Sequence, residues 1–408
     1  MSDFKSINSK EDTKDSVSQL IVVARKLYDK VPLRLRWIAF PLVYCYRIFW
    51  QHRLNLWLVT GDERVSRRPF SILYSANISN LKYLLGLTFG DSFKERYLGR
   101  AWLWNIPKMI AEIGQDCSLM IVQVRKSHFK LLRSSNWFYI PNWVVGEADI
   151  PRDPTVTKNS SLKSDFRRIR KNSLQYEVTQ NPQRFDDFYH DMYVPQITKA
   201  HGSSAFIISY EYMRAEFQNC DLLLVTKQEK HIAGILIAYE KSVPRLWSLG
   251  VRDSNPEYIK DGAVGALFYF SMAYLRDKGF KKVKFGRSRA FLRDGVLHYK
   301  RKWNQRIVGT SKNGFALKVI SCSEAVKVFL HQNPFIFESR GSLHGAIFMD
   351  EEKALTPEDF EKIDKQHFHD GLSKLFIYSL QRGDPVKQDS IPPELSERIV
   401  LRSAKDMA

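Results

Sequence analysis

The sequence has few cysteines, and their positions exclude two common kinds of site. Four occur in 408 residues, at Cys45, Cys117, Cys220 and Cys322. No two have the C-x-x-C spacing typical of zinc ligands, and their wide separation gives no sign of a disulfide framework. We therefore expect no metal site, and a reducing compartment suits the protein best.

Long hydrophobic runs are also missing. No apolar run reaches the roughly 18 residues that a membrane-spanning helix needs. The nearest, Ile38–Tyr46, has basic and aromatic flanks and contains Pro41, which fits either an interfacial helix or a buried helix with a basic outer face. Residues 1–15 are polar, lack a signal-peptide core and are expected to form a disordered leader. We expect a cytoplasmic protein and leave open a peripheral contact with the inner face of an anionic membrane.

Several catalytic motifs are absent as well. The chain has no H-E-x-x-H, no G-x-S-x-G, no P-loop and no dinucleotide fingerprint. What it does have is positive charge, with 63 Lys and Arg against 44 Asp and Glu and a formal net charge of +19. Such a field attracts nucleic acid, anionic lipid or small phosphorylated ligands. A solvated basic surface without a specific partner explains the same composition.

The length predicts more than one domain. Residues 148–161 are polar, contain Pro151 and Pro154, and are expected to be a linker. We expect a helical region with a partial α/β unit in 16–150, and the main unit in 161–308. Strands and a terminal helix from Pro357 to Gln381 in 309–408 would complete or brace the sheet of that unit. Nothing in the sequence determines the oligomeric state.

The order of elements between Ser161 and Trp303 is the strongest signal in the chain. It consists of a basic helix over 162–172, strands over 221–226, 231–239 and 245–251, a helix over 261–278, a strand over 281–285 and a helix over 294–303. A strand, a crossover helix and a further strand indicate a parallel pair after an antiparallel hairpin. The predicted fold class is therefore α/β, with a mixed sheet flanked by helices.

Several segments of this region resemble the GNAT superfamily of acyltransferases, and more closely its Fem-type, FemAB-like branch. They include LKSDFRRIRKNS, LLLVTKQEKHIAGILIAY, FGRS and DGVLHYKRKW. The resemblance covers most of 161–306 and more faintly 70–145, which implies two tandem GNAT-like units. It also implies transfer of an acyl group, such as acetyl, from acyl-CoA to an amine or hydroxyl. The acceptor would be a small molecule or a sugar-linked envelope or polysaccharide precursor.

The resemblance also assigns residues to the donor. Gly250 and Val251 match the strand whose backbone N–H polarises the donor carbonyl, and Gly262 and Gly265 match the phosphate-binding start of the long helix. Gly250 is equally compatible with a plain strand end. Ile259 and Val264 depart from the usual acyl-CoA pattern. Because several Fem-type members use aminoacyl-tRNA, that donor is the alternative, although the lack of a long charged helical hairpin favours acyl-CoA.

Further candidates follow in the next strand and helix. Tyr299 matches the tyrosine that protonates the leaving group in many GNAT enzymes, although an aromatic residue on such a helix is often part of the core. Asp294 is a candidate helix cap or general base, and His298 a candidate base. Arg287 and Ser288 follow a strand end and are expected to contact substrate. The residues Lys300, Arg301 and Lys302 are interpreted as a solvated basic face.

A third hypothesis assigns the protein no catalysis. The fold would then serve as a basic module that binds nucleic acid or an anionic membrane, with an affinity that falls steeply as salt is added. No zinc-finger or helix-turn-helix signature supports nucleic acid specifically.

Overall fold

The computed structural model describes most of the chain from His52 onward. The described residues are 52–75, 78–113, 117–132, 136–153, 155–202, 205, 207–239, 242–350, 355–380, 390–403 and 407. The expected leader and the apolar stretch Ile38–Tyr46 lie outside them. Within the described part of the chain, no helix is long and apolar enough to cross a membrane.

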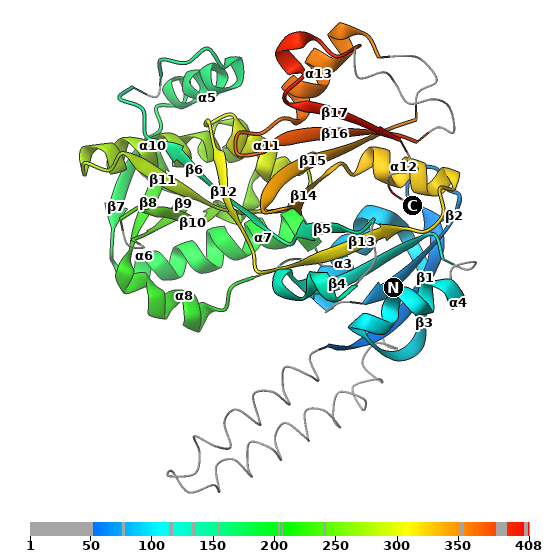
Figure 1. Cartoon of the computed structure of the whole chain (residues 1–408). Coiled ribbons are helices and arrows are strands. Elements are labelled where there is room, and N and C mark those ends of the chain that lie inside the picture. The colour runs from blue at the N-terminus through cyan, green and yellow to red at the C-terminus, as the bar shows by residue number, and fades with distance from the viewer. Residues whose placement is uncertain are drawn as a thin grey trace, which may run out of the picture.

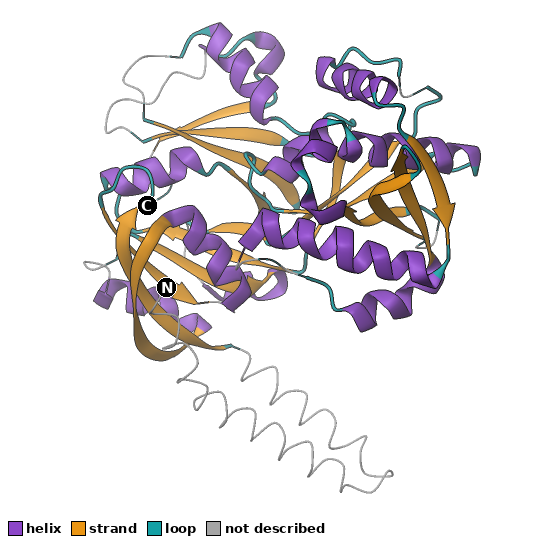
Figure 2. Cartoon of the chain, turned by 180° about the vertical axis from the view of Figure 1, so that it is seen from behind, coloured by secondary structure: helices purple, strands orange, loops and turns teal. Residues whose placement is uncertain are grey.

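Two mixed sheets with helices on both faces form the molecule, which confirms the predicted α/β class (Figure 2). The seven-stranded sheet has the order β12-β6-β11-β10-β9-β8-β7, and the ten-stranded sheet the order β17-β16-β15-β14-β5-β13-β4-β2-β1-β3. N-terminal and C-terminal strands share the ten-stranded sheet, whereas the middle of the chain builds the other (Figure 1).

The strands of the seven-stranded sheet are β6 (Val144–Asp149), β7 (Gln175–Thr179), β8 (Cys220–Lys227), β9 (Lys230–Ala238), β10 (Arg245–Val251), β11 (Lys282–Ser288) and β12 (Arg306–Thr310). Those of the ten-stranded sheet are β1 (Arg53–Glu63), β2 (Pro69–Ser75), β3 (Phe89–Trp102), β4 (Leu119–Arg125), β5 (Phe138–Pro141), β13 (Asn313–Val319), β14 (Phe335–Ser339), β15 (Ser342–Met349), β16 (Lys374–Ser379) and β17 (Ile399–Ser403).

The α-helices are α3 (Ile78–Thr88), α4 (Ile106–Ile113), α5 (Ser160–Lys171), α6 (Pro182–Asp187), α7 (Val194–His201), α8 (Tyr210–Glu216), α9 (Pro256–Lys260), α10 (Ala263–Asp277), α11 (Gly295–Arg301), α12 (Glu324–Gln332) and α13 (Pro357–His367). A π-helix, η7 (Phe188–Tyr193), joins α6 to α7. Residues 182–201 therefore form a continuous helical segment in three parts.

The seven-stranded sheet has the predicted topology. β8 and β9 form an antiparallel hairpin, and β9 pairs antiparallel with β10. The polypeptide then passes through α10 and returns as β11, parallel to β10. Apolar residues on the inner side of α10 pack on this sheet, where Ala266, Leu267 and Leu275 are fully buried.

The two sheets exchange strands. β6, which precedes the expected linker, lies between β11 and β12, and β13 lies between β4 and β5. All four of these pairings are antiparallel. Each exchanged strand lies next to a parallel pair. This pair is β10 with β11 beside β6, and β2 with β4 beside β13. The two halves thus repeat one arrangement, and each half supplies a strand to the other.

The stretch 137–145 contributes to two strands in different sheets, β5 and β6, because the chain crosses from one sheet to the other at Asn142 and Trp143. Two predictions for the C-terminal region need correction. The helix predicted over Pro357–Gln381 ends at His367, and β16 follows it. The strands from β13 to β17 extend the ten-stranded sheet rather than the sheet of residues 161–308.

The turn before β16 touches the other sheet. Ile307 N–H in β12 donates to Asp370 O at 2.7 Å. Gly371 has a φ of +97°, and a Cβ there would lie 2.1 Å from the carbonyl oxygen of Ile307. The C-terminal segment therefore contacts the edge of the seven-stranded sheet at a position that only glycine fits.

Replacing Gly371 with alanine should destabilise the protein strongly. The left-handed conformation costs an L-residue roughly 1–2 kcal/mol, and the collision with backbone adds to it because neither chain segment can give way cheaply. The matched control is Gly341→Ala, which has a φ of +82° but open space around its Cβ position. Chemical denaturation should show a larger loss for Gly371→Ala; equal losses would contradict the proposed close contact.

Candidate functional site

The strands β10 and β11 separate soon after they pair. Their parallel register joins only Arg245 to Lys284 and Leu246 to Phe285. The register of β10 against β9 shifts between Leu246 and Ser248, at the point where the separation begins. Beyond it, one edge of β10 has no strand partner in the described structure. Backbone groups along such an edge can polarise a ligand carbonyl.

Lys300 lies at the start of this separation. Its Nζ donates to the carbonyl oxygen of Gly286, to that of Arg287 at 3.0 Å and to Ser288 Oγ at 3.0 Å. The side chain comes from α11 and is only 6% exposed. Its ammonium group thus replaces the strand partner that the end of β11 has lost. The interpretation of Lys300 as part of a solvated face is wrong.

Burial lowers the pKa of Lys300 to about 7, while Asp294 acts in the opposite direction. Three acceptors surround Nζ and favour the ammonium form. The ammonium form is therefore less favoured than in an exposed lysine, although its hydrogen-bond partners stabilise it. Such a group suits electrostatic stabilisation or proton transfer.

The two residues expected to contact substrate lie beside Lys300. Ser288 is 1% exposed, and its hydroxyl accepts the Lys300 hydrogen bond. The Arg287 side chain is exposed, while its carbonyl oxygen accepts from the same ammonium. The structure thus brings Arg287 and Ser288 to the strand separation, with the serine hydroxyl already bonded within the protein.

Gly250 and Val251 lie at the end of β10, further along the separated edge. A Cβ on Gly250 would lie 2.3 Å from the carbonyl carbon of Met192 in the π-helix. Because Gly250 has no side chain, the backbone of η7 can pack directly against β10 at this position. Val251 is fully buried against the core of the sheet.

The two remaining glycines lie at the start of α10, beneath α5. Gly262 is the N-cap, with a φ of +101°, and a Cβ there would lie 3.0 Å from Cβ of Arg168. A Cβ on Gly265 would lie 3.0 Å from Cγ of Asp165. Both glycines therefore pack against α5, with the carboxylate of Asp165 beside Gly265.

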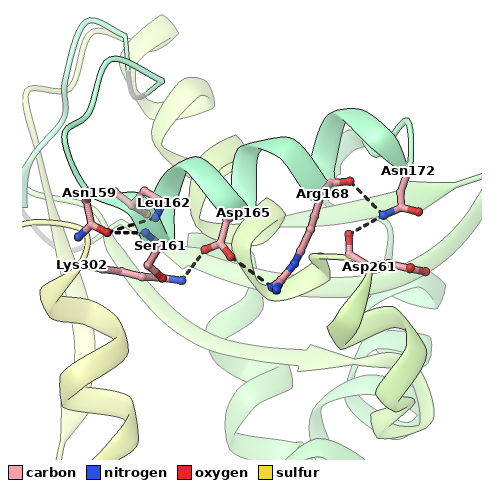
Figure 3. A network of polar contacts seen from close by, with 8 residues as sticks. All are labelled: Asn159, Ser161, Leu162, Asp165, Arg168, Asn172, Asp261 and Lys302. Atoms are coloured by element: carbon pink, nitrogen blue, oxygen red, sulfur yellow. Dashed lines mark hydrogen bonds and ion pairs between the residues drawn. The ribbon is translucent and has the colours of Figure 1, made fainter.

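Asp165 is the centre of a polar network that joins α5 to the ends of α9 and α11 (Figure 3). Its carboxylate is 9% exposed and accepts from Lys302 Nζ, and Arg168 lies 3.8 Å away. At the other end of α5, Asn172 Nδ2 donates to the carbonyl oxygen of Asp261 at 3.0 Å. Lys302 is consequently a buried ion-pair partner rather than a solvated cation.

Tyr299 joins the same cluster. Lys302 Nζ lies 3.7 Å from the centre of its ring, and Phe268 packs against it with the centroids 5.3 Å apart. Its hydroxyl is buried and has no hydrogen-bond partner among the described residues. Burial, reinforced by the charge of Asp165, raises the pKa of the phenol well above 10. The phenol is therefore a weaker acid than an exposed tyrosine.

Asp294 and His298 flank the start of α11. Asp294 Oδ1 accepts from the N–H of Leu297 at 2.8 Å, so it is the N-cap, as one of the two interpretations predicted. His298 is exposed on the same helix. Its side chain therefore faces solvent, whereas those of Lys300 and Ser288 are buried.

The loop before α11 is held by the ten-stranded sheet. Leu292 N–H donates to Pro334 O, and Ile336 N–H to Ala290 O, both at 2.8 Å. The guanidinium of Arg289 lies between two rings, 4.1 Å from the centroid of Tyr83 and 4.0 Å from that of Trp143. Both sheets thus determine where α11 begins and where Lys300 points.

Two signals in the sequence identified this site only in part. The FGRS and HYKRKW segments contain Ser288, Tyr299 and Lys300, but nothing in them distinguishes the buried lysine from its exposed neighbours. Asp165 was not identified from the sequence, because most of the charged residues around it on α5 are basic. It nevertheless lies on the buried side of that helix, together with Leu162, Phe166 and Ile169. That single acid on the apolar face was the available signal.

Two buried histidines lie next to the C-terminal end of α13. His367 is 4% exposed and His369 2% exposed. Burial, together with nearby Arg293 and Arg301, lowers the pKa of His367 to about 4. Burial, Arg301, His298 and His367 lower that of His369 to about 3. Arg301 donates to the carbonyl oxygen of Gln366 at 2.7 Å and so caps α13.

Stability should fall as the pH drops below about 6.5. Above that pH, His367 and His369 are neutral in both the folded and the unfolded protein. Below it, they bind protons in the unfolded chain but not in the folded protein, because folding lowers their pKa values. At pH 5 each should cost about 2 kcal/mol of unfolding free energy. Denaturation at pH 7 and pH 5 should show a smaller difference for His369→Gln than for the native chain. The exposed His190→Gln should retain the full difference; an unchanged difference in His369→Gln would contradict the argument.

No family model matches the chain, and no curated protein does either. Among solved structures, the chain is similar to FemX, with 12% identity over 63% of this chain and 83% of that one and a TM-score of 0.34. It is similar to L-PGS from Bacillus licheniformis, with 12% identity, 67% and 87% coverage and a TM-score of 0.33. A GCN5-related N-acetyltransferase from Anabaena variabilis gives 13% identity, 80% and 85% coverage and a TM-score of 0.28.

Proposed function

We propose that this protein is an acyltransferase that moves an acyl group from an activated donor to an amine or hydroxyl. The observation that carries the proposal is the separation of β10 from β11, with the buried Lys300 at its start. Acyl transfer needs a polarised carbonyl and an acceptor held within attack distance. The unpaired edge of β10 supplies backbone groups of the required kind.

In this proposal the acceptor nitrogen or oxygen forms a bond to the donor carbonyl carbon, and the bond to the leaving group breaks. The acceptor loses a proton and the leaving group gains one. Tyr299 is the proton donor to the leaving group that the resemblance implies; its buried phenol is protonated at neutral pH but is a weaker acid than an exposed tyrosine. Asp294 is engaged as a helix cap, and His298 is the exposed candidate to accept the acceptor's proton.

Lys300 is proposed as a positioning residue. It contacts the backbone of β11 rather than the separated edge itself, and it holds Gly286 and Arg287 where the strands diverge. Its charge also lies next to the edge on which the carbonyl would bind. Loss of the ammonium would therefore both weaken the separation and remove positive charge from the site.

The basic outer face of α5 supports a polyanionic donor. Ser160, Lys163, Ser164, Arg167 and Arg170 line an open hollow of about 300 Å³. We propose aminoacyl-tRNA as the donor that fits this face best. Acyl-CoA stays the other candidate, and its phosphates would also need a place away from the covered start of α10. A non-catalytic basic module would use the same hollow.

The acceptor remains a prediction from the resemblance. An amine or hydroxyl on a small or sugar-linked envelope precursor fits the proposed chemistry. Peripheral contact with an anionic membrane would bring the protein close to such a precursor, and the net charge of +19 favours that contact.

Lys300→Met should lower kcat by about 100-fold, the usual effect of removing one electrostatic contact from an acyl-transfer site. KM for the acceptor should change much less. An inflection near pH 7 in the kcat profile should disappear as well, because that pKa belongs to Lys300. Lys282→Met is the matched control, since Lys282 lies on β11, the strand that Lys300 contacts, but is exposed. Equal activity of the Lys300→Met and Lys282→Met variants would contradict the proposed positioning role of Lys300.

The donor can be identified by salt dependence. Replacing Arg167 and Arg170 with serine should weaken binding of an aminoacyl-tRNA and reduce the slope of log K against log salt by about 1.5. Binding of acetyl-CoA, followed by thermal shift at fixed protein concentration, should not respond to these changes. Stabilisation by acetyl-CoA with no binding of tRNA would favour the acyl-CoA donor. Polyanion binding without turnover of any donor would favour the non-catalytic module.

A further inference from the structure

We propose that the aromatic rings of Trp247 and Tyr212, with the cations Arg245 and Lys284, form an acceptor subsite that takes a sugar ring carrying an anionic group. The role as acceptor subsite rests on the proposed acyl transfer, whereas binding of such a sugar does not. The four side chains come from β10, β11 and α8, close to the place where β10 and β11 separate.

The middle strand of the seven-stranded sheet is partly accessible to solvent at this place. β10 is the fourth of the seven strands. Trp247, Ser248 and Leu249 are nevertheless only half-buried, whereas residues 232–238 of the neighbouring β9 are all buried. Successive residues of a strand point to opposite faces, so Ser248 and Leu249 make both faces of the strand accessible. A ligand can therefore contact β10 although the strand lies in the middle of the sheet.

A β-bulge places Trp247 beside the start of the strand separation. The register of β10 against β9 shifts between Leu246 and Ser248, which makes Trp247 the extra residue. The carbonyl oxygen of Trp247 lies 3.3 Å from the position that a Cβ on Gly286 would take, and Lys300 Nζ lies 4.0 Å from the same position. The backbone of Trp247 and the ammonium of Lys300 therefore meet at one residue of β11.

A second aromatic ring stands almost at a right angle to the indole. The ring centroid of Tyr212 lies 6.2 Å from that of Trp247, and the two planes are 84° apart. Tyr212 is 57% exposed, more than any other Phe, Tyr or Trp among the described residues. Its helix is fixed all the same, because Ser209 Oγ accepts from the N–H of Tyr212 and Met213 is fully buried. The two rings thus form a rigid, accessible corner.

The shape of this corner favours a sugar over a flat base. A base stacks on one ring and leaves a perpendicular ring uncovered, whereas a sugar ring presents C–H groups on its faces and around its rim. These weakly positive C–H groups pack well against the negative faces of aromatic rings. A hydroxyl or amine on the sugar would form the new bond to the donor carbonyl carbon, lose its proton and displace the leaving group, which gains one.

Two neighbouring cations add a preference for negative charge. Arg245 and Lys284 lie opposite each other in the parallel register, so their side chains share one face of the sheet. The guanidinium of Arg245 lies 5.4 Å from the centre of the Trp247 indole. Glu147, opposite Lys284 on β6, pairs with Lys282 at 3.1 Å. Like charges side by side on neighbouring strands repel each other, and an anionic group on the sugar would reduce this repulsion.

Binding can be tested by thermal shift at fixed protein concentration. N-acetylglucosamine 1-phosphate should raise the Tm of the wild-type protein by at least about 2 °C, and by more than inorganic phosphate or N-acetylglucosamine alone. Tyr212→Ala, which removes an exposed ring, should abolish most of this shift. Lys284→Met should reduce it to the value for N-acetylglucosamine. The matched control is Tyr176→Ala, because Tyr176 is a 37% exposed ring on β7, at the edge of the same sheet, and it should keep the full shift.

Kinetics can test the acceptor role. With glucosamine phosphate as the acceptor, Tyr212→Ala and Trp247→Leu should each raise the acceptor KM by about 10-fold, the effect of one lost aromatic contact. The donor KM should not change. Trp247→Phe keeps a ring and should retain most of the affinity, which separates the loss of the ring from a folding defect.

Three results would overturn the inference. They are no shift of the wild type with the sugar phosphate, a full shift in Tyr212→Ala, and a larger shift with adenosine monophosphate, because the corner would then hold a base of the donor. Binding of the sugar phosphate without turnover of any acceptor would contradict the proposed acyl transfer and leave the sugar site standing. Turnover that does not depend on Tyr212 or Trp247 would do the reverse.

Discussion

The hydrogen bonds between two chain crossings are the constraint on which the rest of the structure depends. The chain passes from β5 to β6 at Asn142 and Trp143, and from β12 to β13 at Ser311 and Lys312. Ser311 N–H donates to Trp143 O at 2.9 Å, and Trp143 N–H to Ser311 Oγ at 3.1 Å. The crossings therefore pair with each other as the strands on either side do.

This paired ribbon explains how the site is positioned. It forms part of both sheets, so neither can move without disturbing the ladder of the other. Trp143, within the crossing, packs against Arg289 in the loop before α11. The position of the ribbon therefore determines where α11 begins. The start of α11 in turn determines the position of Lys300, which binds the end of β11. A buried lysine is tolerated there because three acceptors surround it.

A second buried charge, that of Asp165 on α5, is also balanced by a specific partner. The Lys302 ammonium needs a negative partner, and the carboxylate of Asp165 on α5, which lies beside Gly265 of α10, supplies it. The remaining cations of α5 point outward. On the inner side of α5 the positive charge of Lys302 is neutralised by Asp165, whereas the cations on the outer side of α5 are exposed. That division makes the proposed polyanionic donor compatible with a covered helix terminus.

The sequence alone determined the elements of the seven-stranded sheet. The succession of strands β8, β9 and β10 and the long apolar α10 follow from local patterns, and the structure confirms them. The cap at Asp294 could also be predicted, since a helix N-cap depends only on neighbouring residues. Periodicity and capping act over a few residues, and therefore they can be read without the fold.

Only the tertiary structure decided which segments meet. A run of apolar residues from 137 to 145 gives no sign that its halves join different sheets, because strand exchange depends on partners about 170 residues away. The same limit hid Lys300 and Asp165: a lysine among basic residues and an acid on a basic helix look solvated until a distant strand or helix buries them. Burial and pairing are properties of the assembled fold, and they changed these two residues from surface charges into the centre of the candidate site.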